Sequence, residues 1–205
     1  AAHKFFDQTT HAKQNARVDG VVGYLGLGDE NVAASAGTPT PTPDPVESLN
    51  LPGYQEADGE WRAAAAAAEC PWRAKPWVPT AHGLRDALVA YWAGVTEIML
   101  VLMEMAEVAL ELPRGHFKDA FARPGTLLRL AWYPSTKSGG GGGGGGAAME
   151  PQLRYGAHTD FDGFTILQRA LVDGGDGVDG LEYETRDGRW VPVPALPDTL
   201  TINIG

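Results

Sequence analysis

Apolar residues recur at every third or fourth position across residues 80–112, a spacing that predicts one long amphipathic helix. The apolar stripe is formed by Leu84, Leu88, Tyr91, Val95, Ile98, Leu102, Met105 or Ala106, and Ala109. Thr80 is the expected N-terminal cap, and Pro113 with Gly115 is expected to end the helix. A single stripe of this kind is typical of a helix that packs its apolar side against a protein core.

Beyond Pro124 the hydrophobic period shortens to two residues, which predicts β-strands in place of helices. In the first strand, residues 127–133, one face carries Leu128, Leu130 and Trp132 and the other carries Arg129, Ala131 and Tyr133. Further strand-like runs occupy residues 153–158, 164–168, 181–184, 190–193 and 199–204. Short strands between glycine-rich turns are typical of an antiparallel sandwich or jelly roll, so we expect an α+β protein with its helices first.

Two segments of low complexity interrupt these elements. Residues 37–45 are rich in threonine and proline, and we expect an extended loop because proline lacks a backbone donor and restricts the residue before it. Residues 139–146 are all glycine, so we expect a flexible insertion at 136–150. The predicted organisation is an N-terminal helical region at 1–122 and the first part of a jelly-roll core at 123–205.

The charge balance narrows the range of partners. The chain has 26 acidic and 16 basic residues, and a net charge of −10 argues against binding nucleic acid or an anionic membrane. A membrane span is not expected, because Glu104, Glu107 and Glu111 interrupt the most apolar stretch. The single Cys70 cannot form an internal disulfide, which fits a reducing compartment. We therefore expect a cytoplasmic monomer that acts on a small molecule.

The residues with the clearest chemistry are His158 and Asp160. Side chains two positions apart on a strand project from the same face, so an imidazole and a carboxylate can converge on one metal ion. With a second histidine they would form the facial triad of non-haem iron(II) sites, which leaves three coordination positions open. A His-x-Asp pair alone is a weak signal, and a purely structural role for both residues is the alternative.

The residues around this pair, 153–168, closely resemble the metal-binding strand of the isopenicillin N synthase-like family of iron(II)- and 2-oxoglutarate-dependent dioxygenases. The likeness continues in the same order along the chain. It includes residues 23–30, 44–51, the predicted long helix, 128–134, 187–193 and 202–205. Within the second of these segments, Val46 stands where the family usually has lysine.

This resemblance implies a double-stranded β-helix, or jelly roll, with N-terminal helices, incomplete at its C-terminal strands. His158 and Asp160 would be two iron ligands, and Tyr133 and Arg129 would bind the co-substrate. The implied cofactors are iron(II), 2-oxoglutarate and dioxygen. Ala131 replaces a family asparagine beside this tyrosine, and the alternative is that Arg129 faces solvent while Tyr133 packs.

The resemblance also predicts that the chain is truncated at both ends. The family's second histidine ligand and its 2-oxoglutarate-binding arginine would lie beyond residue 205. The remaining histidines all precede the predicted barrel strands and are expected on the surface: His3, His11, His82 and His116. The chain alone is therefore expected to bind iron weakly and to be inactive.

The function implied for the full-length protein is oxidation of a small organic molecule by hydroxylation, desaturation or ring closure. Two alternatives remain open. One is an iron oxidase of the same fold that does not use 2-oxoglutarate. The other is a non-catalytic fragment or degenerate paralogue that binds a ligand or partner.

Overall fold

A computed structural model describes residues 1–18, 22–35, 43–52, 54–55, 60–61, 83–119, 121, 126–134, 153–160, 163–170 and 180–205. These residues form two compact units, Ala1–His158 and Thr159–Gly205. The predicted cap Thr80, the glycine-rich insertion 136–150 and most of the loop 37–45 lie outside the described residues.

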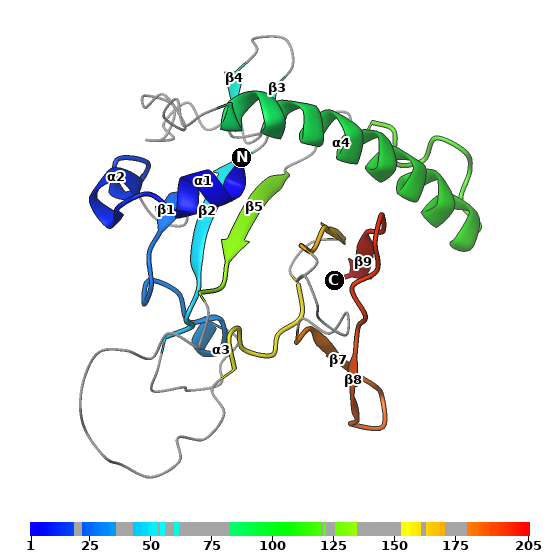
Figure 1. Ribbon diagram of the computed structural model, residues 1–205. Coiled ribbons are helices and arrows are strands. Elements are labelled where there is room, and N and C mark those ends of the chain that lie inside the picture. The colour runs from blue at the N-terminus through cyan, green and yellow to red at the C-terminus, as the bar shows by residue number, and fades with distance from the viewer. Residues whose placement is uncertain are drawn as a thin grey trace. The chain divides into compact units, whose positions relative to one another are not determined.

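The first unit is built on an antiparallel sheet in which strands far apart in the sequence lie side by side (Figure 1). Its strands are β1 (Gly23–Leu25), β2 (Glu47–Pro52) and β5 (Leu127–Trp132), with β2 in the middle. Leu49 is opposite both Tyr24 of β1 and Leu130 of β5. The sheet thus joins strands from both predicted regions, 1–122 and 123–205. Strands β1 and β2 show that the first region contains strands as well as the expected helices.

The first unit also contains several shorter elements. They are α1 (Ala2–Phe6), α2 (Thr10–Gln14), α3 (Val32–Ser35), and the small ladder of β3 (Tyr54–Gln55) with β4 (Glu60–Trp61). Thr9 caps α2, because its hydroxyl accepts a hydrogen bond from the Ala12 amide at 3.3 Å.

One face of the sheet forms the apolar core with α1 and the start of the long helix. The buried cluster is Phe5, Phe6, Ala16, Tyr24, Leu49, Leu51, Leu84, Leu88 and Leu128. Leu130 and Trp132 pack against it, and the Phe6 and Trp132 rings are stacked with centroids 5.8 Å apart. The predicted face of Leu128, Leu130 and Trp132 is therefore confirmed as the core face of β5. Its alternate residues point to the opposite face.

The predicted long helix is confirmed as α4 (Leu84–Ala109), which follows Gly83 in the left-handed conformation at φ +75°. Leu84 and Leu88 are buried in the core, as the stripe predicts. Towards the C-terminal end, Met105 is 61% exposed. The sequence left either Met105 or Ala106 as the apolar-stripe residue at this turn, and Ala106 is the less exposed of the two.

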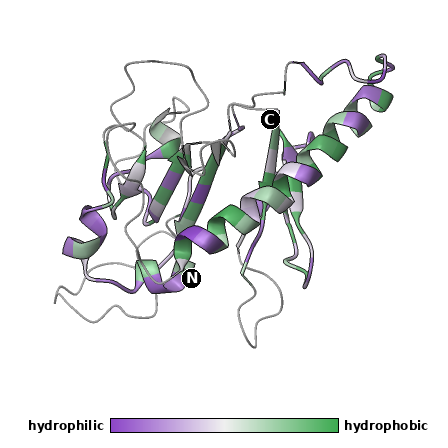
Figure 2. Cartoon of the chain, turned by 90° about the horizontal axis from the view of Figure 1, so that it is seen from above, coloured by the Kyte–Doolittle hydropathy of each residue, from purple (hydrophilic) through white to green (hydrophobic). Residues whose placement is uncertain are grey.

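Apolar and polar residues alternate along α4 (Figure 2). Within the described part of the chain, α4 is long and apolar enough to cross a membrane by length and composition alone. A single helix of this kind is weak evidence for a membrane span. Glu107 shows how one polar residue is accommodated, because its buried carboxylate accepts hydrogen bonds from the amides of Gly115 at 2.7 Å and Phe117 at 3.0 Å. These bonds hold the pKa of Glu107 below its usual value and fold the following loop back onto the helix.

Glycine is required at the start of β1. Gly23 has φ +82°, and a Cβ atom there would lie 2.3 Å from the carbonyl oxygen of Ala16. The close approach allows the Tyr24 amide to donate to that oxygen at 3.0 Å. Any other residue would have to separate these two backbone segments.

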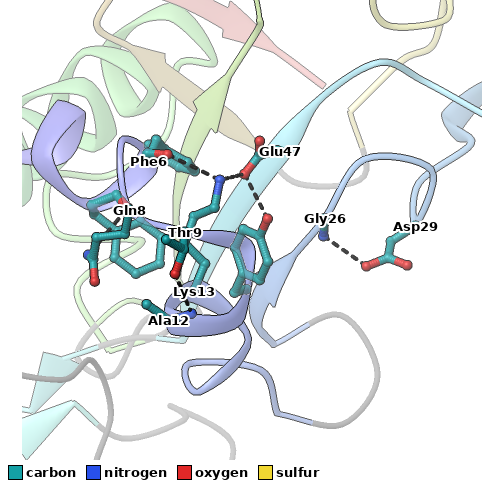
Figure 3. Close-up of polar contacts among 10 residues, drawn as sticks. Phe6, Gln8, Thr9, Ala12, Lys13, Gly26, Asp29 and Glu47 are labelled. Carbon is teal, nitrogen blue, oxygen red and sulfur yellow. Dashed lines mark hydrogen bonds and ion pairs between the residues drawn. The ribbon is translucent and has the colours of Figure 1, made fainter. Parts of the chain in front are cut away.

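A buried ion pair fastens α2 to the sheet (Figure 3). Lys13 is 5% exposed, and its ammonium contacts the Glu47 carboxylate and donates to the Phe6 carbonyl at 3.1 Å. The Tyr24 hydroxyl donates to the same Glu47 oxygen at 2.7 Å. Burial and this bond to Glu47 raise the pKa of Tyr24 well above its usual value, so the phenol remains protonated.

The second unit contains two antiparallel pairs: β6 (Phe164–Leu167) with β9 (Thr201–Ile204), and β7 (Glu182–Glu184) with β8 (Trp190–Pro192). All four strands were predicted from the period of two, and they are confirmed within a few residues. Arg169, which lies just after β6, donates to Val193 O at 2.8 Å and Pro194 O at 2.6 Å in the segment after β8, and to the Thr201 hydroxyl of β9 at 3.2 Å.

The predicted strand at 153–158, in the first unit, is wrong. These residues bend and make no strand. Two of their contacts are local: the His158 ring bonds to the Gly156 carbonyl and meets the Tyr155 ring edge-on. Alternation of apolar and polar residues cannot distinguish such a bend from a strand.

We expect Glu47→Gln to lower the free energy of unfolding by about 3–5 kcal/mol, because it leaves the buried Lys13 ammonium without a carboxylate. The double variant Lys13→Met/Glu47→Leu should lose less, since no buried charge remains. Arg17→Ala, which removes an exposed ion pair with Asp29, is the control and should cost less than about 1 kcal/mol. Urea unfolding measures all three, and a Glu47→Gln cost as small as the control's would contradict the assignment.

Candidate metal centre

His158 lies in the bend that precedes the unit boundary. Its Nδ1 is 2.8 Å from the carbonyl oxygen of Gly156, which is buried. A carbonyl oxygen can only accept, so Nδ1 carries the hydrogen and a neutral ring has its lone pair on Nε2. A histidine that binds metal through one ring nitrogen usually donates from the other to a group such as a backbone carbonyl.

Asp160 is held within the second unit by two neutral donors. The Thr165 hydroxyl donates to Asp160 Oδ2 at 2.5 Å, and the Asn203 amide donates to the same oxygen at 2.6 Å. The two donors belong to β6 and β9. Hydrogen bonds of this kind favour the ionised carboxylate, which is the form that binds a metal.

The donor chemistry of these two residues fits iron(II). A neutral imidazole and a carboxylate are two of the three ligands in a facial triad, and both have the hydrogen-bond partners that such ligands need. Among the residues that the structure describes, no three His, Cys, Asp or Glu side chains gather to hold a metal ion. The described chain therefore supplies two ligand candidates, His158 in the first unit and Asp160 in the second.

Arg129 lies on the face of β5 opposite to the core, and there it takes part in a polar cluster. Its Nη1 donates to Glu30 Oε2 at 2.9 Å and lies 3.4 Å from Asn50 Oδ1. The Ser48 hydroxyl donates to the other Glu30 oxygen at 2.6 Å. We call Glu30, Ser48, Asn50 and Arg129 the polar face of the sheet.

The other terminal nitrogen of the Arg129 guanidinium, Nη2, does not share the hydrogen bonds of Nη1. Nη2 is buried, and the described residues offer it no hydrogen-bond partner. A buried donor without an acceptor costs roughly 1–3 kcal/mol, so this atom is suited to an acceptor brought by a ligand. The alternative in which Arg129 simply faces solvent does not fit its ion pair with Glu30, whose side chain is 12% exposed.

Tyr155 connects the polar face to His158. The guanidinium carbon of Arg129 lies 5.2 Å from the Tyr155 ring centroid, in cation–π geometry. The same ring lies 5.1 Å from the His158 ring and meets it edge-on. A single aromatic side chain thus separates the candidate iron ligand from the predicted co-substrate arginine.

Tyr133 immediately follows β5, and the residue is 37% exposed. Burial raises the pKa of Tyr133, while the nearby Arg129 charge opposes that rise. The phenol therefore stays protonated at neutral pH and keeps a hydrogen to donate. Tyr133 and Arg129, the two residues predicted to bind co-substrate, are thus electrostatic neighbours.

Three of the remaining histidines can be located. His3, His11 and His116 are exposed, as expected, and His82 lies outside the described residues. The His3 ring packs edge-on against Trp132 at 5.0 Å, and the His116 ring packs in the same way on Phe117. The contacts of these two rings are thus with aromatic side chains.

Sequence reasoning missed Thr165, Asn203, Glu30 and Tyr155. A weak signal existed for Asn203, which stands between two isoleucines in a strand although asparagine is depleted from strands. Thr165 gives no such signal, because threonine is common in strands. Glu30 reaches Arg129 across 99 positions of sequence, and no local pattern can indicate such a pair.

We compared the chain with known proteins. No protein-family model matches the chain. The whole chain aligns at 27% identity with 52% of validamycin A dioxygenase from Streptomyces hygroscopicus subsp. limoneus. It aligns at 26% identity with 54% of the 2-oxoglutarate-Fe(II) type oxidoreductase ppzC from Metarhizium rileyi. The chain therefore spans about half the length of these relatives.

A solved structure is similar along the whole chain. A full-length Neurospora crassa protein, crystallised in complex with alpha-KG, matches with a TM-score of 0.68 at 21% identity over 57% of its own length. Similarity at this identity establishes a shared fold. The family resemblance found in the sequence is confirmed by these relatives, one named as a dioxygenase and the other as a 2-oxoglutarate-Fe(II) type oxidoreductase.

The burial of Tyr133 and its proximity to Arg129 predict how the pKa of its phenol differs from the usual value and how it responds to mutation. Its pKa should lie above the usual 10.0, and Arg129→Met should raise it further because a cation that favours the phenolate is lost. The measurement is tyrosinate absorbance against pH, taken as the difference between each protein and its own Tyr133→Phe variant. Titration at or below the usual value, or a fall on removing Arg129, would contradict this account.

Proposed function

We propose that this chain is the iron-binding part of an iron(II)- and 2-oxoglutarate-dependent oxygenase, the class of its relatives. His158 and Asp160 are the proposed iron ligands. The observation that carries this proposal is the hydrogen bond from His158 Nδ1 to the Gly156 carbonyl, which is the contact that the ring of a metal-binding histidine usually makes. A third ligand would come from outside the described residues.

We further propose that the complete fold is a jelly roll preceded by helices. The antiparallel pairs β6–β9 and β7–β8 and the sheet β1–β2–β5 support this proposal. The similarity to the Neurospora crassa structure along the whole chain supports it as well. The organisation into a helical region at 1–122 and a barrel region at 123–205 remains part of this proposal.

Bound iron(II) would supply the redox chemistry that couples decarboxylation of 2-oxoglutarate by dioxygen to oxidation of a substrate. The protein's part is to hold ligands and orient molecules. The imidazole of His158 is kept in one tautomer by Gly156, and the Asp160 carboxylate is kept in one orientation by Thr165 and Asn203. Fixed ligands of this kind lower the reorganisation needed when substrate and co-substrate bind.

The polar face gives the proposed co-substrate site. Arg129 Nη2 is a buried donor in need of an acceptor, and Tyr133 keeps a phenolic hydrogen. Together they can donate to the carboxylate of 2-oxoglutarate. Tyr155 lies between Arg129 and His158, so an anion held here would be close to the proposed iron ligand.

The substrate of the whole protein is proposed to be a small organic molecule. One relative's name specifies validamycin A, and the chain's acidic charge is unsuited to polyanionic partners. The outcome, whether hydroxylation, desaturation or ring closure, depends on which substrate bond is held near the iron. We also propose a cytoplasmic location from the single cysteine.

In the protein that contains this chain, Asp160→Ala should reduce succinate formation from 2-oxoglutarate by more than about 100-fold, because it removes the anionic ligand. His158→Ala should do the same. Asp187→Ala, which alters an exposed aspartate bound to Thr185, is the matched control and should retain activity. Unchanged turnover in Asp160→Ala would refute the site, and turnover without 2-oxoglutarate would favour an oxidase that does not use it.

Arg129→Lys tests the co-substrate site. A lysine can keep the ion pair with Glu30 but cannot supply the second donor that Nη2 provides. We expect the KM for 2-oxoglutarate to rise by about 10- to 100-fold, the worth of a hydrogen bond to a charged group. Iron affinity should be unchanged. A KM equal to that of the unaltered protein would place the carboxylate elsewhere.

A further inference from the structure

The Asp160 carboxylate lies over a cross-strand pair. In the antiparallel pairing of β6 with β9, Thr165 and Asn203 are directly opposite each other. Directly opposite residues point to the same face of a sheet. Both side chains reach the same carboxylate oxygen, Asp160 Oδ2, at 2.5 Å and 2.6 Å.

The origins of the two donors make the arrangement specific. Thr165 is five residues from Asp160, whereas Asn203 is 43 residues away. Only the register that pairs Thr165 with Asn203 brings both donors to one oxygen, because a slip of one residue would turn the side chains of one strand to the other face. The register of β6 with β9 therefore determines how Asp160 is held.

The chemistry of this pair suits a metal ligand. Hydroxyl and amide donors stabilise the ionised carboxylate without placing a positive charge beside it, so they do not compete electrostatically with a cation. Two bonds to one oxygen also fix the plane of the carboxylate. A ligand already fixed in this way loses less conformational freedom when it binds a metal.

We propose that Thr165 and Asn203 are positioning residues that orient the Asp160 carboxylate to bind a divalent cation. This inference rests on the proposed function, since it assumes that Asp160 is a metal ligand. The inference goes beyond the proposed function because it assigns a role to two residues that do not themselves bind the metal. Their role is exerted through Asp160 and is separate from their part in the strand pairing.

The test measures metal affinity in the protein that contains this chain, with Co²⁺ as the probe and its visible absorption as the signal. Thr165→Val and Asn203→Leu should each weaken Co²⁺ binding by about 10- to 100-fold, the usual effect of removing the hydrogen-bond partner of a metal ligand. Thr165→Ser keeps the hydroxyl and should bind Co²⁺ with the affinity of the unaltered protein. Thr185→Val is the matched control, because it removes another threonine–aspartate hydrogen bond of 2.5 Å in the same unit.

Circular dichroism checks that each variant remains folded at the temperature of the titration. If Thr165→Val and Asn203→Leu only lower the melting temperature and leave Co²⁺ affinity equal to that of Thr185→Val, the proposal is wrong. Asp160→Ala separates this failure from failure of the proposed site. If Asp160→Ala weakens binding but the two variants do not, the positioning role alone fails. If Asp160→Ala has no effect, or the unaltered full protein shows no saturable binding, both fail.

Discussion

The central strand β2 buries three polar side chains, Glu47, Ser48 and Asn50, and a buried polar group is costly unless it finds a hydrogen-bond partner. Each finds its partner in a different segment. Glu47 binds Lys13 of α2 and Tyr24 of β1, Ser48 binds Glu30, and Asn50 lies beside Arg129 of β5. The requirement to pair these groups ties the first unit together around β2. Apolar contacts alone would specify its register less strictly.

The same strand separates two environments. Leu49 and Leu51 project into the apolar core, while Ser48 and Asn50 project to the polar face. One sheet therefore provides both the core that stabilises the unit and the polar face that leads through Tyr155 to His158. A candidate site built on a sheet in this way inherits the rigidity of the core behind it.

The long helix and strand β5 were predictable because their evidence is local: a period of 3.6 in one and of two in the other. The candidate iron ligands were found by the type and spacing of His158 and Asp160. Strand β2 was not predicted, because its polar residues are explained only by partners that lie far away in sequence, such as Arg129. The pairing of Thr165 with Asn203 was missed for the same reason, since register is a property of two strands together.

The ladder between β6 and β9 is short, with four residue pairs in a two-stranded sheet, and isolated pairs of this size are only marginally stable in water. Because Asp160 is bonded to both strands, any cation that it holds is thermodynamically linked to their pairing. The linkage is reciprocal: occupancy strengthens the ladder by the same free energy with which the ladder improves occupancy. Amide hydrogen exchange at β6 and β9 would thus report whether the carboxylate is loaded with a cation.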